Sequence, residues 1–253
     1  MIRTAFLIAL LSAPAIAQET PETGDSFHEI FRGISSKMWI VSDGWSNGAH
    51  QNCTWSKQAV GLSYGQLQLR FLDDPERDRE YLCGEVQSVN RYGYGTFEAR
   101  VRTGRGSGLN AAFFTYIGPA QESPHDEIDF EILLRDTSSV SLNSYVSGED
   151  HNGAEVQIPG RTSEEFHTYS MIWEPRKIRW YVDGHLLHTA HGPVPSHPQK
   201  ILFSLWGSDT LSEWMGNFVR PSAPVTMEVD WVAYTKLGER CQFDGSILCV
   251  LQR

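Results

Sequence analysis

Apolar and polar residues alternate with a period of two through much of this sequence, a pattern that is typical of β-strands. Asp183-Gly184 follows one alternating segment and predicts a tight hairpin, because both turn residues must adopt positive φ. Almost no segment shows the longer period of an amphipathic helix. The prediction is therefore an all-β fold, a sandwich or jelly roll in the first place and a barrel in the second. Strands are expected at 66–71, 96–101, 167–173, 177–182, 200–206 and 225–235.

The N-terminus has the features of a secretory signal peptide: a positive start at Arg3, a short apolar run, and a small-x-small sequence ending at Ala17. The apolar run is shorter than the ~20 residues that span a bilayer. We expect cleavage after Ala17 and a secreted protein, extracellular or periplasmic. The predicted organisation is a signal peptide over 1–17, a flexible leader over 18–26, one domain over 27–240, and a tail with a cysteine pair over 241–253.

Charge and cysteine content narrow the function further. The formal net charge is -10 with no basic stripe, which disfavours nucleic-acid binding. We expect a soluble monomer without a membrane partner. An even number of cysteines in an exported chain predicts disulfides, although spacing alone allows three pairings. The cysteines are Cys53, Cys83, Cys241 and Cys249, and none has zinc-type spacing.

Three acidic residues at alternate positions form the candidate active site. In a strand, Glu127, Asp129 and Glu131 lie on one face, and the apolar residues between them lie on the other. A helix would separate Asp129 from both glutamates. Three acids on one strand face repel one another, so at least one must hold its proton at neutral pH. Glycoside hydrolysis needs such a pair, since one carboxylate attacks the anomeric carbon and a protonated one assists the leaving oxygen.

The spacing of the two glutamates is compatible with this chemistry. Their Cα atoms should lie roughly 13 Å apart, at about 3.3 Å per residue. Side chains that lean inward would bring the carboxyls to about 5 to 7 Å, which favours a retaining mechanism without settling it. The structural alternative is a solvated acidic face on a half-buried strand.

The sequence also resembles glycoside hydrolase family 16. Glu127-Ile128-Asp129-Phe130-Glu131 is similar to the family's Glu-x-Asp-x-Glu signature. The stretch around Asp43 to Gln51, His125-Asp126-Glu127 and Cys241-Gln242-Phe243 are most similar to secreted glycanases that trim succinoglycan-type exopolysaccharide. Other segments resemble landmarks of the bacterial lichenases: 52–55, 92–98, 113–116, 166–169, 180–184 and 205–207.

This resemblance implies a jelly roll of two curved antiparallel sheets with a sugar cleft on the concave face. It implies Glu127 as nucleophile, Glu131 as general acid and base, and Asp129 as the residue that orients the nucleophile. No cofactor is implied for catalysis. The residues that match sugar contacts are Asn47, Glu85, Phe114, Tyr116, His125, Asn143, Tyr145, Trp206 and Trp214.

The resemblance also implies disulfides and a metal. Cys53 and Cys83 match the lichenase disulfide, which leaves Cys241 with Cys249. A structural calcium is implied on the convex side, with Asp230 as its side-chain ligand and backbone carbonyls near Ile30 and Gly65.

Three positions depart from the lichenase pattern. His125 stands in place of Trp, Gln87 in place of Arg and Ser204 in place of Asn. The predicted function is a secreted endo-β-glucanase that hydrolyses internal bonds of a 1,3-1,4-β-glucan or a succinoglycan-type exopolysaccharide by a retaining mechanism. The alternatives are a transglycosylase on a β-glucan and a carbohydrate-binding module without catalysis.

Overall fold

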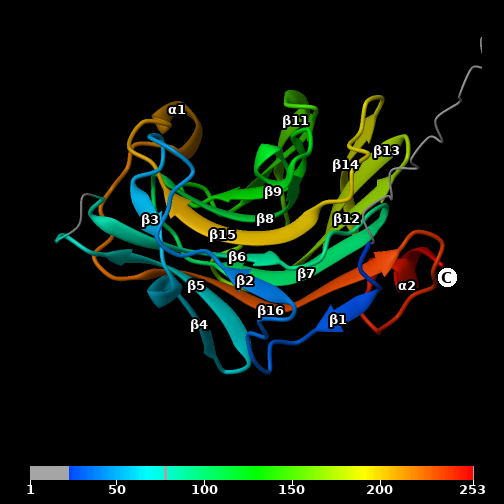
Figure 1. Ribbon diagram of the computed structural model, residues 1–253, viewed down its shortest axis with the longest axis horizontal. Helices are drawn as coiled ribbons and strands as arrows, with labels where there is room; N and C mark the ends of the chain where they lie inside the picture. The colour runs from blue at the N-terminus through cyan, green and yellow to red at the C-terminus, as the bar shows by residue number, and fades with distance from the viewer. Residues whose placement is uncertain (1–22, 77–78, 253) are drawn as a thin grey trace, which may run out of the picture.

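The computed structural model describes residues 23–76 and 79–252, and nearly all of its regular structure is β. The predicted all-β jelly roll is confirmed, with two curved layers joined through β6 (Tyr81–Ser88). Figure 1 shows β8, β9 and β15 in the inner layer, lying over β7 and β16 in the outer one. The predicted signal peptide lies outside the described residues. Among the described residues, no helix is long and apolar enough to cross a membrane.

The inner layer is the sheet that carries the three acids. Its strands pair antiparallel in the order β11-β10-β9-β8-β15-β6, with β2 on the other side of β6 for part of its length. Their bounds are β2 (Trp39–Val41), β8 (Leu109–Ile117), β9 (Asp126–Leu133), β10 (Ser139–Val146), β11 (Glu149–Gln157) and β15 (Lys200–Gly207).

The outer layer continues from β6 in the order β5-β16-β7-β12-β13-β14. β1 pairs with β16, β4 with β5, and β3 runs parallel to β6. Their bounds are β1 (Phe27–Glu29), β3 (Cys53–Trp55), β4 (Val60–Ser63), β5 (Gln66–Asp73), β7 (Gly95–Thr103), β12 (His167–Glu174), β13 (Lys177–Val182), β14 (His185–His191) and β16 (Val225–Lys236). The short helices are η1 (Lys57–Ala59), η2 (Pro119–Gln121), α1 (Ser212–Met215) and α2 (Ile247–Leu251).

The predicted strands and the hairpin are confirmed. Each expected segment lies within a strand, and Asp183 and Gly184 adopt φ of 50° and 79° between β13 and β14. The core lies between the two layers, where the apolar residues of β9 are buried. Phe130, for example, packs edge-on against Tyr169 of β12 with ring centroids 5.3 Å apart. Burial of each such side chain contributes about 1.5 to 3 kcal/mol, so packing in the core fixes the position of β9.

Both predicted disulfides form. Cys53 of β3 bonds Cys83 of β6, with Cα atoms 5.8 Å apart, and Cys241 bonds Cys249 in the tail, with Cα atoms 5.0 Å apart. The first bridge closes a sequence separation of 30 residues, and the second closes only 8. Because the entropy lost by the unfolded chain grows with loop length, the first bridge should stabilise the fold more.

Both ends of the described chain are bonded to the body of the domain. Residues 23–26 belong to the expected flexible leader, yet Gly24 N donates to Arg91 O at 2.8 Å and Ser26 Oγ accepts from Lys236 N at 2.9 Å. The tail is held by more than its own cysteines. Glu98 of β7 is fully buried and accepts hydrogen bonds from Ser246 Oγ at 2.5 Å and Ile247 N at 2.7 Å.

Candidate active site

Strand β9 lies between β8 and β10, and its alternate side chains lie on opposite faces of the sheet, as expected. Glu127, Asp129 and Glu131 all line one cleft, while Ile128 and the other apolar residues enter the core. The neighbours in register across β8 and β10 are Tyr116 and Tyr145 for Glu127, Phe114 and Asn143 for Asp129, and Ala112 and Ser141 for Glu131. The three acids therefore sit in the middle of the sheet, flanked by aromatic and polar side chains.

The cleft on this face has a volume of about 890 Å³. All nine residues predicted to contact sugar line it: Asn47, Glu85, Phe114, Tyr116, His125, Asn143, Tyr145, Trp206 and Trp214. The structure adds Trp45, His50, Gln87, Ala120, Gln121, Ser141, Leu142, Gly153, Lys200, Leu202 and Leu211. Of the three departures from the lichenase pattern, His125 and Gln87 line the cleft, and Ser204 is buried opposite Glu85 on β6.

Glu131 is positioned to act as a proton donor. Burial raises its pKa to about 8, although the amide Nδ2 of Asn110 donates to its Oε1 at 3.0 Å and the charge of Glu127 adds to the rise. At neutral pH the Glu131 carboxyl is therefore mostly protonated. A general acid in glycoside hydrolysis requires such a raised pKa.

Glu127 has surroundings that favour its ionised form more strongly. Burial raises its pKa, but hydrogen bonds from His125 and Asp129 lower it. His125 Nε2 lies 2.6 Å from Glu127 Oε2. Burial and the charges of the two glutamates raise the pKa of Asp129 well above its usual value, which favours the neutral form that can donate its proton to Glu127. Of the three acids, Glu127 is thus the one whose hydrogen bonds most favour the charged form.

The backbone of β9 is fixed by contacts outside the cleft. Asp126 is buried and accepts from the backbone N–H groups of Ser147, Ser196 and His197 at 2.9, 3.0 and 3.2 Å. Trp180 Nε1 donates to the carbonyl of Asp129 at 3.0 Å from the far side of the strand. These bonds hold the acids in place without using any group that faces the cleft.

The polar and aromatic walls suit a sugar chain. The amide oxygen of Asn143 is buried and has no partner among the described residues, so it is available to a hydroxyl group. Trp206 and Trp214 lie with ring centroids 6.3 Å apart, and Trp45 is 45% exposed. Aromatic faces of this kind pack on the apolar faces of pyranose rings. Trp45 was absent from the predicted contacts, although it lies two residues before Asn47 within the motif that Asp43 begins.

Glu85 is a further acid in the cleft wall. It is buried, Ser42 Oγ donates to its Oε1 at 2.5 Å, and burial raises its pKa to about 7. No basic side chain pairs with it among the described residues. It can therefore present a partly protonated carboxyl, able both to donate to and to accept from sugar hydroxyls.

The bond between His125 and Glu127 leads to a prediction about pH. In His125→Phe the ring can still stack on Tyr145, where the His125 ring now lies nearly parallel at 4.9 Å between centroids, but the bond to Glu127 is lost. Because that bond lowers the pKa of Glu127, its loss should move the acid limb of kcat/KM to higher pH. Profiles of kcat/KM from pH 4 to 8 measure this shift. His125→Gln, which keeps a donor, should shift less, and an unchanged acid limb in His125→Phe would contradict the role assigned to the bond.

Asp230 lies on the outer layer, at a bulge in β16 between Val229 and Trp231. Its Oδ2 accepts from Arg100 Nη1 at 2.5 Å. Within the described residues, no group of three or more His, Cys, Asp or Glu side chains could hold a metal. A calcium ion at Asp230 would bind mainly to backbone carbonyls, and it would compete with Arg100 for the single carboxylate.

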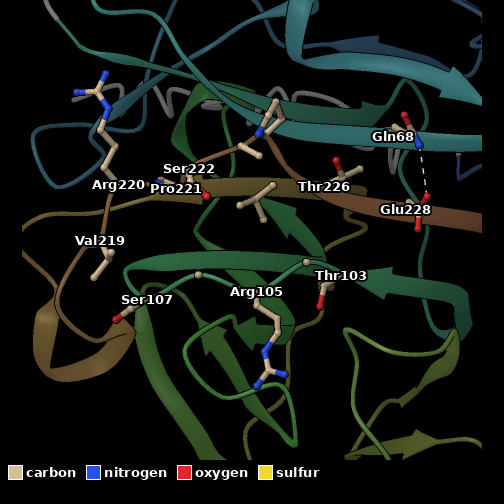
Figure 2. Close-up of a pocket in the computed structure, with 15 residues that line it drawn as sticks. Gln68, Thr103, Arg105, Ser107, Val219, Arg220, Pro221, Ser222, Thr226 and Glu228 are labelled. Carbon is tan, nitrogen blue, oxygen red and sulfur yellow. Dashed lines mark hydrogen bonds between the residues drawn. The ribbon is translucent and has the colours of Figure 1, made fainter.

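A second hollow, of about 650 Å³, lies between the start of β16 and the turn after β7. Figure 2 shows Arg105 and Arg220 at its margins and a hydrogen bond from Gln68 to Glu228. Glu228 also accepts from Arg102 Nε at 2.7 Å. Glu228 is the one acid that lines this hollow among the described residues, and it is already paired, so the hollow cannot supply two free carboxyls.

Comparisons with known proteins agree with this geometry. The model of the glycosyl hydrolases family 16 matches residues 47–233. The endo-1,3-1,4-beta-glycanase ExoK of Rhizobium meliloti is 48% identical over 230 residues, covering 90% of this chain and 85% of that protein. The beta-glucanase of Bacillus subtilis is 38% identical over 237 residues, covering 93% and 96%. The structure of Bacillus licheniformis beta-glucanase superposes with a TM-score of 0.81 at 37% identity, covering 85% of this chain and all of that one. With its family model, its relatives and its paired carboxyls in agreement, the chain is a member of glycoside hydrolase family 16.

Proposed function

We propose that this protein is a secreted endo-β-glucanase that cleaves internal bonds of a 1,3-1,4-β-glucan or a succinoglycan-type exopolysaccharide with retention of anomeric configuration. The observation that carries the proposal is that Glu127 and Glu131 line one cleft from the same strand, with Glu127 bonded to His125 and Glu131 bonded to the amide of Asn110. Two carboxyls with opposed protonation states are what a double displacement needs. The names of the relatives support the substrate class.

In the first step, the Glu127 carboxylate attacks the anomeric carbon while Glu131 transfers its proton to the departing glycosidic oxygen. A covalent glycosyl-enzyme forms, and the sugar on the leaving side departs with its new hydroxyl. In the second step, Glu131, now ionised, takes a proton from water, which attacks the same carbon and releases Glu127. Asp129 keeps its proton throughout and donates to Glu127, which holds that carboxylate in orientation.

Parallel digestion of lichenan, laminarin, xyloglucan and succinoglycan tests this function. We expect internal cleavage of lichenan or succinoglycan, seen as a rapid fall in polymer size with few early monosaccharides. Proton NMR of the first products should show the β-anomer before mutarotation. The α-anomer would exclude retention, products larger than the substrate would indicate a transglycosylase, and binding without turnover of any of the four polymers would indicate a binding module.

Three further parts of the proposal concern the whole protein. We infer removal of residues 1–17, which N-terminal sequencing of the exported protein would test, and a monomer, which its mass in solution would test. We also infer a structural calcium that competes with Arg100 for Asp230, away from the catalytic acids. A rise in Tm on adding calcium that is absent in Asp230→Asn would support this site, because a ligand bound only to the folded state stabilises it.

A further inference from the structure

Two cations face each other across the end of the inner sheet. Tyr92 and Gln199 form an isolated antiparallel bridge, which places Arg91 opposite Lys200, the first residue of β15. Like charges in directly opposed positions destabilise a strand pair. Consistent with this, burial and the charge of Arg91 both lower the pKa of Lys200. A structural role alone would not require two cations at this position.

Neither cation has an acidic partner in the described part of the chain. Lys200 Nζ donates to Gln87 Oε1 at 2.9 Å, and Arg91 Nη2 donates to the backbone carbonyl of Gln121 at 3.3 Å. Lys200, Gln87 and Gln121 all line the catalytic cleft. An ammonium group has three donors, so Lys200 keeps two for a further partner. The net charge of -10 means that acidic groups outnumber cations in this protein. Lys200 nevertheless has no acidic partner among the described residues.

The position of Lys200 relates it to the reaction. In register, Lys200 lies opposite Tyr116 on β8, and Tyr116 lies opposite Glu127 on β9. Lys200 and Glu127 are therefore two strands apart in the same row of the sheet, roughly 10 Å between Cα atoms. Both side chains line the cleft. A sugar close to the cleaved bond could therefore carry a substituent that reaches Lys200.

We propose that Lys200, supported by Arg91 and the side chain of Gln87, forms an anion subsite that binds a carboxylate on the polysaccharide near the cleaved bond. This inference rests on the proposed hydrolysis of a β-glucan and deepens it, since it names an acidic β-glucan as the preferred substrate class. A neutral glucan has hydroxyl groups only and would leave the charge of Lys200 without a counter-ion. A carboxylate would satisfy its free donors and relieve its repulsion from Arg91.

The test compares one polymer in two forms: a 1,3-1,4-β-glucan, and the same glucan with a small fraction of its primary hydroxyls oxidised to carboxylates. We expect the wild-type protein to show a higher kcat/KM on the oxidised form at low salt. In Lys200→Gln the ratio of kcat/KM on the oxidised form to that on the neutral form should fall about twofold to fivefold, the range for one solvent-accessible ion pair. Arg91→Gln should lower the ratio less, because Arg91, unlike Lys200, is not among the residues that line the cleft.

Lys177→Gln is the matched control, because Lys177 lies on β13 of the outer layer and pairs with Glu174. Its ratio should equal that of the wild-type protein. An unchanged ratio in Lys200→Gln, or a wild-type protein that prefers the neutral glucan, would overturn the subsite. A gain with a sulfated glucan but none with the carboxylated one would overturn the assignment of a carboxylate. Turnover of the neutral glucan by the wild-type protein tests the proposed hydrolysis separately.

Discussion

Glu127→Ala should lower kcat/KM on lichenan or succinoglycan by about 10⁴-fold or more, because it removes the group that we propose forms the covalent intermediate. The fold should survive, because the Glu127 side chain faces the cleft and the apolar residues of β9 keep the strand packed against the core. The space left by the carboxylate should admit a small anion. Azide should therefore restore part of the activity with an activated aryl β-glycoside and yield the α-glycosyl azide, which NMR identifies.

Asp129→Asn is the matched control for Glu127→Ala. Because the raised pKa of Asp129 favours the form that donates to Glu127, an amide of the same shape can keep that bond. We expect a far smaller loss of kcat/KM, about tenfold, from the altered orientation of the nucleophile. Equal losses in Glu127→Ala and Asp129→Asn, or a β-glycosyl azide from the first variant, would refute the assignment of Glu127 as nucleophile.

Glu131→Gln should lower kcat/KM on the polysaccharide by about 10²- to 10⁴-fold, the usual contribution of a general acid. An aryl glycoside whose leaving group needs no proton should lose much less in its first step, and stopped-flow release of the aryl group measures this. The wild-type protein should lose activity as pH rises through about 8, where Glu131 ionises. Equal losses on the two substrates would show that Glu131 is not the proton donor.

The same substitution should make the protein more stable at neutral pH. Burial raises the Glu131 pKa from 4.5 to about 8, so between these values the folded state binds more protons than the unfolded state. Wild-type stability therefore falls as pH rises through this window, by up to about 1.4 kcal/mol per pH unit from this group. Glutamine does not titrate, so the Tm advantage of Glu131→Gln should be small near pH 4.5 and reach several degrees near pH 8.

Thermal unfolding of both proteins across this pH range measures the difference. Lys177→Gln again serves as a control, since its ion pair with Glu174 lies at the surface. A Tm advantage that stays constant from pH 4.5 to 8 would show that Glu131 titrates in the folded protein much as it does in the unfolded chain.

The strands were predictable because their signal is local. A half-buried strand must alternate apolar and polar side chains, so the segments 66–71 and 177–182 could be recognised from their own residues. The shared face of Glu127, Asp129 and Glu131 follows from the same rule. The positions of the cysteines did not determine their pairing, which needed the resemblance to family 16 and which the structure then confirmed.

The long-range contacts of the tail and of Asp230 could not be predicted from local sequence patterns. The cysteine pair of the tail could be predicted. Nothing in residues 241–253, however, indicates that Ser246 donates a hydrogen bond to Glu98, which lies 148 positions earlier in the sequence. Nor could the sequence indicate that Arg100 meets Asp230, because a bulge in β16 directs that carboxylate. Contacts between distant strands depend on register, and register is set by the packing of whole layers.

By itself, the sequence determined that the chain forms strands, which face of β9 carries the acids, and which family's chemistry those acids match. Only the tertiary structure decided which of the three acids favour the protonated form, because the desolvation that raises the pKa of Glu131 and the bonds from His125 and Asp129 to Glu127 exist only when the layers close. It also placed Arg91 opposite Lys200, since the bridge between Tyr92 and Gln199 joins segments more than 100 residues apart.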